Sequence, residues 1–99
     1  MSTSRATVDH LLEQLEPLPV RARAMFGEHG LYCDETFVGV ICDDVLFLKP
    51  TAATDGLPEG APYPGAKAHR IVVAETVEEP ALLQRLVAET AAALPARRR

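Results

Sequence analysis

The chain has 99 residues, of which 47% are apolar and 24% are charged, and its formal net charge at pH 7 is −4. This length fits one domain around one hydrophobic core, and the composition argues against both intrinsic disorder and a membrane span. The acidic balance argues against strong binding to nucleic acid, because that binding depends on Lys and Arg side chains that neutralise phosphates. The N-terminus has no signal-peptide core, so we expect a soluble, cytoplasmic protein.

An amphipathic helix is predicted near the N-terminus. Its apolar residues recur at i, i+3, i+4 and i+7, which places them on one helical face; they are Val8, Leu11, Leu12 and Leu15. Thr7 is the expected N-cap. Pro17 and Pro19 cannot continue a helix, so we expect it to end near Leu15 or Glu16.

Four strands are predicted in the following third of the chain, over residues 21–26, 31–33, 37–42 and 45–49. Gly27 and Gly30 mark a turn after the first of them. The pairs Asp34-Glu35 and Asp43-Asp44 separate the others, and their length fits two-residue hairpins.

Strict alternation along these strands places apolar side chains on both faces of the sheet. One face is expected to carry Leu31, Cys33, Val38, Val40, Cys42, Val45 and Phe47. The other is expected to carry Tyr32, Phe37, Ile41, Leu46 and Leu48. The helices of this chain can cover one face, so we expect the other to be covered by self-association, as a homodimer. The same register places Cys33 and Cys42 too far apart for an intramolecular disulfide, and both are expected to be buried or half-buried thiols.

A long connection follows over residues 50–68, rich in Gly and Pro. Residues 51–54 are expected to form one helical turn, and Tyr63, between two prolines, is expected to anchor the loop to the sheet. The β-branched run over residues 69–75 predicts a further strand.

A second long helix is predicted to start near Pro80, because Thr76 and Glu79 have capping-box spacing. Its buried stripe is expected to be Leu83, Leu86, Val87, Thr90 and Leu94. Pro95 ends it. The order of elements predicts a single α+β domain over residues 1–99: two layers, with an antiparallel sheet of about five strands flanked by N- and C-terminal helices. Its core is expected over residues 7–95, with a disordered basic tail at 96–99.

The side chains that could carry chemistry show no diagnostic spacing; they are His10, His29, His69, Cys33, Cys42, Asp43 and Asp44. A small-ligand site or a thiol-dependent enzyme site around Cys33, with His29 and an acidic turn residue, is one alternative. We expect instead that the thiol is buried and inert and that His29 lies in a solvated turn. Asp43 and Asp44 are expected to stabilise their turn rather than bind a cation. We therefore expect no catalytic residue, metal or cofactor.

Basic side chains suggest a second alternative, direct binding of nucleic acid. Arg21 and Arg23 project from one face of a predicted strand, and residues 97–99 are all arginine. Ion pairs with Glu13 or Glu16 explain the first two arginines equally well. Binding that weakens steeply with salt would identify this alternative.

Several short motifs between residues 23 and 49 resemble the N-terminal domain of the TfoX/Sxy family, bacterial proteins linked to the regulation of natural competence. They are an Arg-x-Met-Phe-Gly start, a Gly-Leu-Tyr strand, a Phe-x-Gly strand, an Asp-Asp turn and a Leu-x-Leu-Lys strand. The matching residues are Arg23, Met25, Phe26, Gly27, Gly30, Leu31, Tyr32, Phe37, Gly39, Asp43, Asp44, Leu46, Leu48 and Lys49. A Tyr-Pro-Gly element at residues 63–65 extends the resemblance.

The resemblance implies a noncatalytic α+β domain, often dimeric, in proteins that help a cyclic-AMP receptor-type regulator to switch on competence genes. It predicts a stand-alone N-terminal domain that acts as a protein-interaction module and transcription co-regulator. Its expected interaction surface comprises Arg21, Arg23, Tyr32, Phe37, Ile41 and Tyr63.

Overall fold

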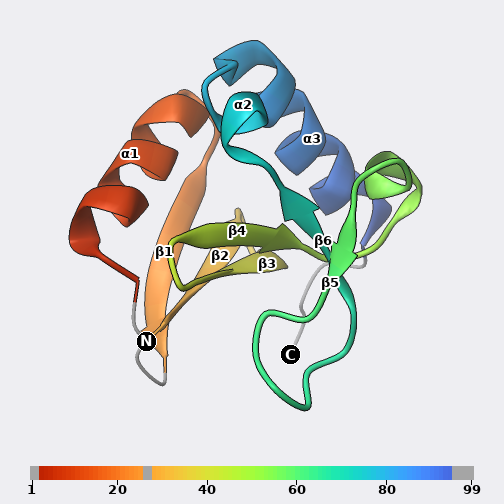
Figure 1. The fold of residues 1–99 in the computed structure, drawn as a ribbon. Coiled ribbons are helices and arrows are strands. Elements are labelled where there is room, and N and C mark those ends of the chain that lie inside the picture. The colour runs from red at the N-terminus through yellow and green to blue at the C-terminus, as the bar shows by residue number, and fades with distance from the viewer. Residues whose placement is uncertain (1–2, 26–27, 95–99) are drawn as a thin grey trace.

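The computed structural model describes residues 3–25 and 28–94. The elements follow in the order α1 (Arg5–Leu15), β1 (Val20–Met25), β2 (Glu28–Cys33), β3 (Thr36–Cys42), β4 (Val45–Leu48), η1 (Ala52–Thr54), β5 (Glu59–Gly60), β6 (His69–Val72), α2 (Ala74–Val77) and α3 (Pro80–Ala93). The strands form one antiparallel sheet of six in the order β1-β2-β3-β4-β6-β5. The three α-helices lie on one side of this sheet (Figure 1). The α+β prediction is therefore confirmed, with one strand more than expected.

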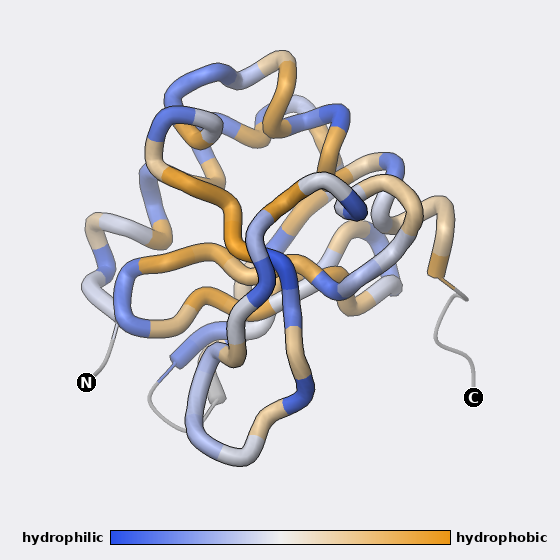
Figure 2. Tube along the Cα trace, turned by 45° about the vertical axis from the view of Figure 1, so that its right-hand side comes forward, coloured by the Kyte–Doolittle hydropathy of each residue, from blue (hydrophilic) through white to orange (hydrophobic). Residues whose placement is uncertain are grey.

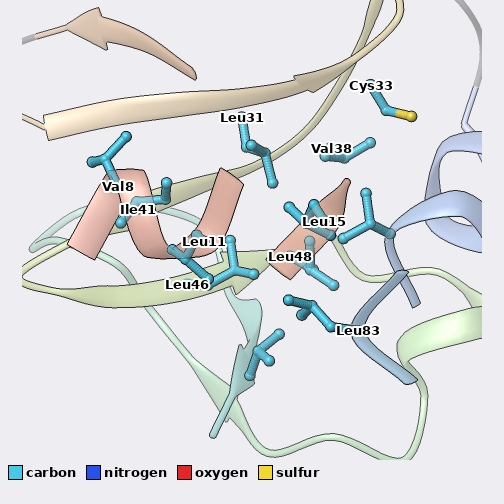
Figure 3. Close-up of a cluster of buried hydrophobic side chains, with 12 residues drawn as sticks. Val8, Leu11, Leu15, Leu31, Cys33, Val38, Ile41, Leu46, Leu48 and Leu83 are labelled. Carbon is cyan, nitrogen blue, oxygen red and sulfur yellow. The ribbon is translucent and has the colours of Figure 1, made fainter. Parts of the chain in front are cut away.

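The main core lies between the helices and the sheet (Figure 3). Helix α1 contributes Val8, Leu11 and Leu15, and α3 contributes Leu83 and Val87, all buried. The facing side chains of the sheet are Leu31, Cys33, Val38, Ile41, Leu46, Leu48 and Val72. Hydrophobic stretches are concentrated in the central strands, and the turn between β3 and β4 is hydrophilic (Figure 2). No helix within the described residues is long and apolar enough to cross a membrane.

The predicted division of the strands into two faces is wrong beyond Val38, because β3 contains one extra residue. Leu31 pairs with Gly39 and Tyr32 with Phe37, so Val38 has no partner in β2. A bulge of this kind shifts the alternation by one and reverses every later side chain. Seven residues therefore exchange faces relative to the prediction. Ile41, Leu46 and Leu48 point to the helices, and Val40, Cys42, Val45 and Phe47 point away.

The two hairpins have the two-residue turns that the sequence predicts. Cys33 pairs with Thr36 and Cys42 with Val45, which leaves two-residue turns at 34–35 and 43–44. Asp34, Asp43 and Asp44 have φ values of 55°, 53° and 66°. Aspartate tolerates this left-handed conformation better than most residues, which explains turns that lack glycine. Gly30 was expected in a turn but lies within β2.

Some helix and strand boundaries differ from the prediction because other residues than expected cap the helices. Helix α1 starts at Arg5 with Ser4 as its N-cap, and Thr7, the expected cap, donates its backbone N–H to Ser4 Oγ at 3.2 Å. The capping box at Thr76 and Glu79 is absent, because residues 74–77 form the short helix α2 and Glu79 caps α3 without a side-chain bond. The last predicted strand accordingly ends at Val72 instead of residue 75.

The long connection contains more structure than expected. The predicted turn over 51–54 is confirmed as η1, with Thr51 and Thr54 forming a capping box. The two-residue strand β5 was not predicted. Its residues, Glu59 and Gly60, pair with β6 and lie between Pro58 and Pro62 in the sequence. Phe26, the basic tail and Pro95 lie outside the described residues.

Gly39 is required by the close approach of two strands next to the bulge. A methyl group at this position would collide with the backbone carbonyl oxygen of Phe47 in β4. We predict that Gly39→Ala lowers the free energy of unfolding by about 1–3 kcal/mol, the usual cost of overpacking. Urea denaturation followed by circular dichroism measures it.

Gly56→Ala is the matched control, because a methyl group at Gly56 meets nothing within 4 Å. It should change stability by no more than about 0.5–1 kcal/mol in either direction. A Gly39→Ala variant as stable as the parent would contradict the close strand approach.

Candidate functional site

The face of the sheet opposite the helices, called here the outer face, carries a second apolar cluster. Val40, Cys42 and Phe47 form its buried centre, and Phe37, Val45 and Ile71 pack around them half-buried. These side chains come from β3, β4 and β6, where alternation after the bulge turns them away from the helices. The sheet is thus apolar on both faces, as expected, and none of the described helices covers this one (Figure 1).

A row of two cations and two aromatic rings crosses the outer face. The Arg21 guanidinium lies 4.9 Å from the centre of the Tyr32 ring, and Lys49 Nζ lies 5.0 Å from the centre of the Phe37 ring. The two ring centres are 5.2 Å apart. The four residues come from β1, β2, β3 and the position directly after β4, so the row runs across the strands. Cations over aromatic faces are weakly attracted and hold these rings in place.

The predicted interaction surface is brought together only in part. Arg21, Arg23, Tyr32 and Phe37 share the outer face, since Arg23 pairs with Gly30 two positions from the Arg21–Tyr32 pair. Ile41 is fully buried under the helices, because the bulge reverses its direction. Tyr63 does not anchor its loop to the sheet; it is 57% exposed.

The expected ion pairs of Arg21 and Arg23 with Glu13 or Glu16 are not formed among the described residues. Strand alternation explains this, because both arginines point to the outer face, whereas α1, which carries Glu13 and is followed directly by Glu16, lies on the other side.

The cysteine and histidine side chains do not assemble a nucleophile. His29 lies inside β2 and not in a turn, opposite Ile41, and its Nδ1 is buried without a hydrogen-bond partner among the described residues. Cys33 is four residues further along the same strand. At about 3.3 Å per residue this is roughly 13 Å, too far for the imidazole to take the thiol proton.

Both thiols are buried and free. Burial, and then the negative charge of Asp34, raises the pKa of Cys33. Burial, and then Glu28 and Asp43, raises the pKa of Cys42. The two residues also lie on opposite faces of the sheet, Cys33 under the helices and Cys42 on the outer face. Both features favour structural thiols over reactive ones.

The acidic turn between β3 and β4 holds the N-terminal segment against the sheet. The backbone N–H of Ser4 donates to Asp44 Oδ1 at 2.8 Å, and the N–H of Asp44 donates to Thr3 Oγ1 at 3.2 Å. Glu28 Oε1 accepts from the N–H groups of Thr3 at 3.1 Å and Asp43 at 3.2 Å. The described residues contain no group of three or more His, Cys, Asp or Glu side chains placed to hold a metal ion.

A cleft of about 500 Å³ opens on the helical side, at the end of the sheet. It is bounded by the first half of α1, by the start of β4 and by the segment from β6 into α2. His10 Nε2 on α1 lies 2.7 Å from Glu78 Oε2, which directly follows α2, so this pair spans the cleft. The sequence offers no local signal for the cleft, because its walls are distant in the chain.

A sequence profile described as the TfoX N-terminal domain matches residues 10–94 of this chain. The chain belongs to the TfoX N-terminal domain family. The resemblance read from the short motifs is thereby confirmed, and the profile spans the structure from α1 to the end of α3.

A curated relative from Spirochaeta aurantia is 46% identical over 101 residues, which cover 97% of this chain and 87% of the relative. It is described as an uncharacterized 12.7 kDa protein in the trpE 5′ region. The high mutual coverage indicates a protein of similar extent built around the same domain.

The Asp44 carboxylate should make stability depend on acidic pH. Its hydrogen bonds from the Ser4 backbone and from the Thr7 side chain favour the ionised form and hold the pKa of Asp44 below its ordinary value of 3.8. The stabilisation is therefore present above that ordinary value and is lost as pH falls through the folded-state pKa. We predict that Asp44→Asn flattens the loss of thermal stability below pH 4.

Asp34→Asn is the control, because Asp34 also has positive φ but its carboxylate makes no hydrogen bond among the described residues. It should leave the acid dependence unchanged. Melting temperatures measured across the acidic range compare the three proteins, and equal slopes for the parent and Asp44→Asn would argue against the role of this carboxylate.

Proposed function

We propose that this protein is a noncatalytic interaction domain that forms a homodimer through the outer face of its sheet. The observation that supports the proposal most directly is the second apolar cluster on a face that the described helices leave open. Half-buried Tyr32, Phe37 and Ile71 at its surface gain burial when a partner covers them.

The charges around this face suit a second copy of the chain. Arg21, Arg23 and Lys49 lie on it, and the adjoining turn presents the exposed acids Asp34 and Glu35. In a two-fold dimer, a basic residue of one copy can face an acidic residue of the other, and the same contact then occurs twice. A face that carries both positive and negative side chains can therefore be complementary to a second copy of itself.

Pairing through the edges of the sheet is less favourable than pairing through the face. In an antiparallel pair of β1 strands, Arg21 and Arg23 of both copies fall on the same side, and like charges that face one another destabilise a sheet. The other edge, β5, has only two residues.

The family resemblance extends the proposal to regulation. In this reading the protein is a cytoplasmic transcription co-regulator of the TfoX/Sxy type, which acts on a protein partner such as a cyclic-AMP receptor-type regulator. The net charge of −4 supports contact with protein instead of DNA.

Light scattering of the purified protein tests the dimer. We expect a mass twice the 10.7 kDa of one chain. Phe37→Glu and Ile71→Glu place a carboxylate on the outer face and should give monomers that keep their circular dichroism spectrum, since both side chains are only half-buried.

Leu82→Glu is the matched control, a half-buried leucine on α3 in the helical layer. It should leave the dimer intact. A monomeric parent protein, or dimers in both outer-face variants, would refute this proposal.

The row of Arg21, Tyr32, Phe37 and Lys49 favours a second candidate, binding of single-stranded nucleic acid. Aromatic rings flanked by cations stack bases and neutralise phosphates on open sheets. Fluorescence anisotropy with a labelled oligonucleotide distinguishes the candidates, because this one requires binding that falls steeply with salt and is lost in Arg21→Gln and Tyr32→Ala.

Thiol labelling tests the absence of nucleophilic chemistry. Because the pKa values of Cys33 and Cys42 are raised, little thiolate exists at neutral pH, and we expect slow reaction with an aromatic disulfide until the protein is denatured. The same raised pKa values mean that stability falls as pH rises past the ordinary value of 9.0. Single Cys→Ser variants assign the rates, and fast native labelling of Cys33 would instead favour an enzyme.

A further inference from the structure

The cleft between α1, β4 and the β6–α2 segment has the size of a small-molecule site. Its volume of about 500 Å³ lies inside the range of roughly 300–1,000 Å³ that is typical of ligand pockets. It lies on the helical side of the sheet, although Val45 and Ile71, which pack against the outer cluster, also line it. Phe37 does not line the cleft, so Phe37→Glu tests the dimer separately from this inference.

The floor of the cleft is apolar. Leu11, Leu46 and Val72 reach it from α1, β4 and β6, and each is no more than 4% exposed. Ala6 and Ala74, both exposed residues of the walls, have side chains too small to fill the space above. An apolar group that enters the cleft is therefore removed from water without displacing the core.

The walls of the cleft are held in place by hydrogen bonds between distant segments. Gln14 Nε2 on α1 donates to the Val77 carbonyl of α2 at 2.7 Å, and His10 Nε2 contacts Glu78 Oε2 at 2.7 Å. On the other side the Asp44 carboxylate accepts the Ser4 N–H at the start of α1. A cavity with fixed walls binds without first ordering them, which favours affinity.

The charges at the rim are acidic. Asp44 and Glu78 line the cleft together with His10 and Thr7, and no Lys or Arg among residues 3–25 and 28–94 does. The Glu78 oxygen Oε1 takes part in no hydrogen bond within the described part of the chain. The rim thus offers acceptors and negative charge above an apolar floor.

We infer that the cleft binds a small molecule with an apolar body and a protonated amine, the body resting on Leu11, Leu46 and Val72 and the ammonium group at the carboxylate of Glu78. A carboxylate or phosphate ligand would meet repulsion at the same rim. A neutral alcohol would gain the apolar contact alone.

Nuclear magnetic resonance titration of the full chain with hexylamine, hexanoate and hexanol tests the inference. Hexylamine should shift the backbone amides around the cleft and bind more tightly than hexanol, with hexanoate weakest. Glu78→Gln should lower the affinity for hexylamine by about two- to fivefold, the effect of one solvent-exposed ion pair, and leave hexanol unchanged.

His10→Gln separates the charge of Glu78 from its contact with His10, because it removes the imidazole and keeps the carboxylate. It should bind hexylamine as tightly as the parent protein or more tightly. Ala74→Trp and Ala6→Trp should each fill the cleft and abolish binding, and Ala92→Trp, on the exposed side of α3, should not.

Three results would overturn the assignment. They are hexanoate binding as tight as that of hexylamine, amide shifts confined to other parts of the protein, and unchanged hexylamine affinity in both Glu78→Gln and a folded tryptophan variant. None of them bears on the homodimer, which Phe37→Glu tests at a residue that does not line the cleft.

Discussion

One extra residue in β3 decides which side chains meet the helices. Because Leu31 pairs with Gly39 and Tyr32 with Phe37, both Val38 and Gly39 lie toward the helical side. From that point Ile41, and across the hairpin Leu46 and Leu48, complete the main core. Without the bulge, the side chains of β3 and β4 that follow it would point to the opposite faces of the sheet. The apolar face of α1 would then lose the side chains against which it packs.

Gly39 makes this arrangement sterically possible. Its missing side chain lets β3 approach the Phe47 carbonyl of β4 at the place where the bulge bends the strand. Phe47 is in turn the largest residue of the outer cluster. The glycine of the Phe-x-Gly motif is therefore required by packing, because a larger residue there would displace the strand that carries Phe47 of the outer cluster.

The elements with strong local periodicity could be predicted from the sequence. The stripes of α1 and α3, the two-residue turns and the turn at η1 depend on neighbours in the chain, and they appear close to where the sequence places them. The bulge could not be predicted, because residues 37–42 have no polar side chain at either the odd or the even positions. A shift of one residue therefore does not change the hydrophobic pattern. The strand β5 is too short to carry a pattern.

The same distinction holds for the functional surfaces. Arg21, Arg23, Tyr32 and Phe37 could be placed on one face because they precede the bulge, whereas Ile41 follows it and was misplaced. The cleft depends on contacts such as Gln14 with Val77 and Ser4 with Asp44, which join segments more than 35 residues apart. No local pattern encodes such contacts.

The two surfaces lie on opposite sides of the same two strands. In β4, Leu46 reaches the cleft and Phe47 the outer cluster, and in β6 Val72 reaches the cleft. Val45 and Ile71 pack against the outer cluster and also line the cleft. Leu46 pairs with Val72 and Phe47 with Ile71, so the two strands present matched pairs to each side. Leu46 and Phe47, adjacent in β4, therefore belong to different surfaces, whereas Val45 and Ile71 belong to both, and a substitution acts on a surface only if its side chain contributes to it. This parity is the physical reason that a change such as Phe37→Glu and one such as Glu78→Gln report on separate properties of the molecule.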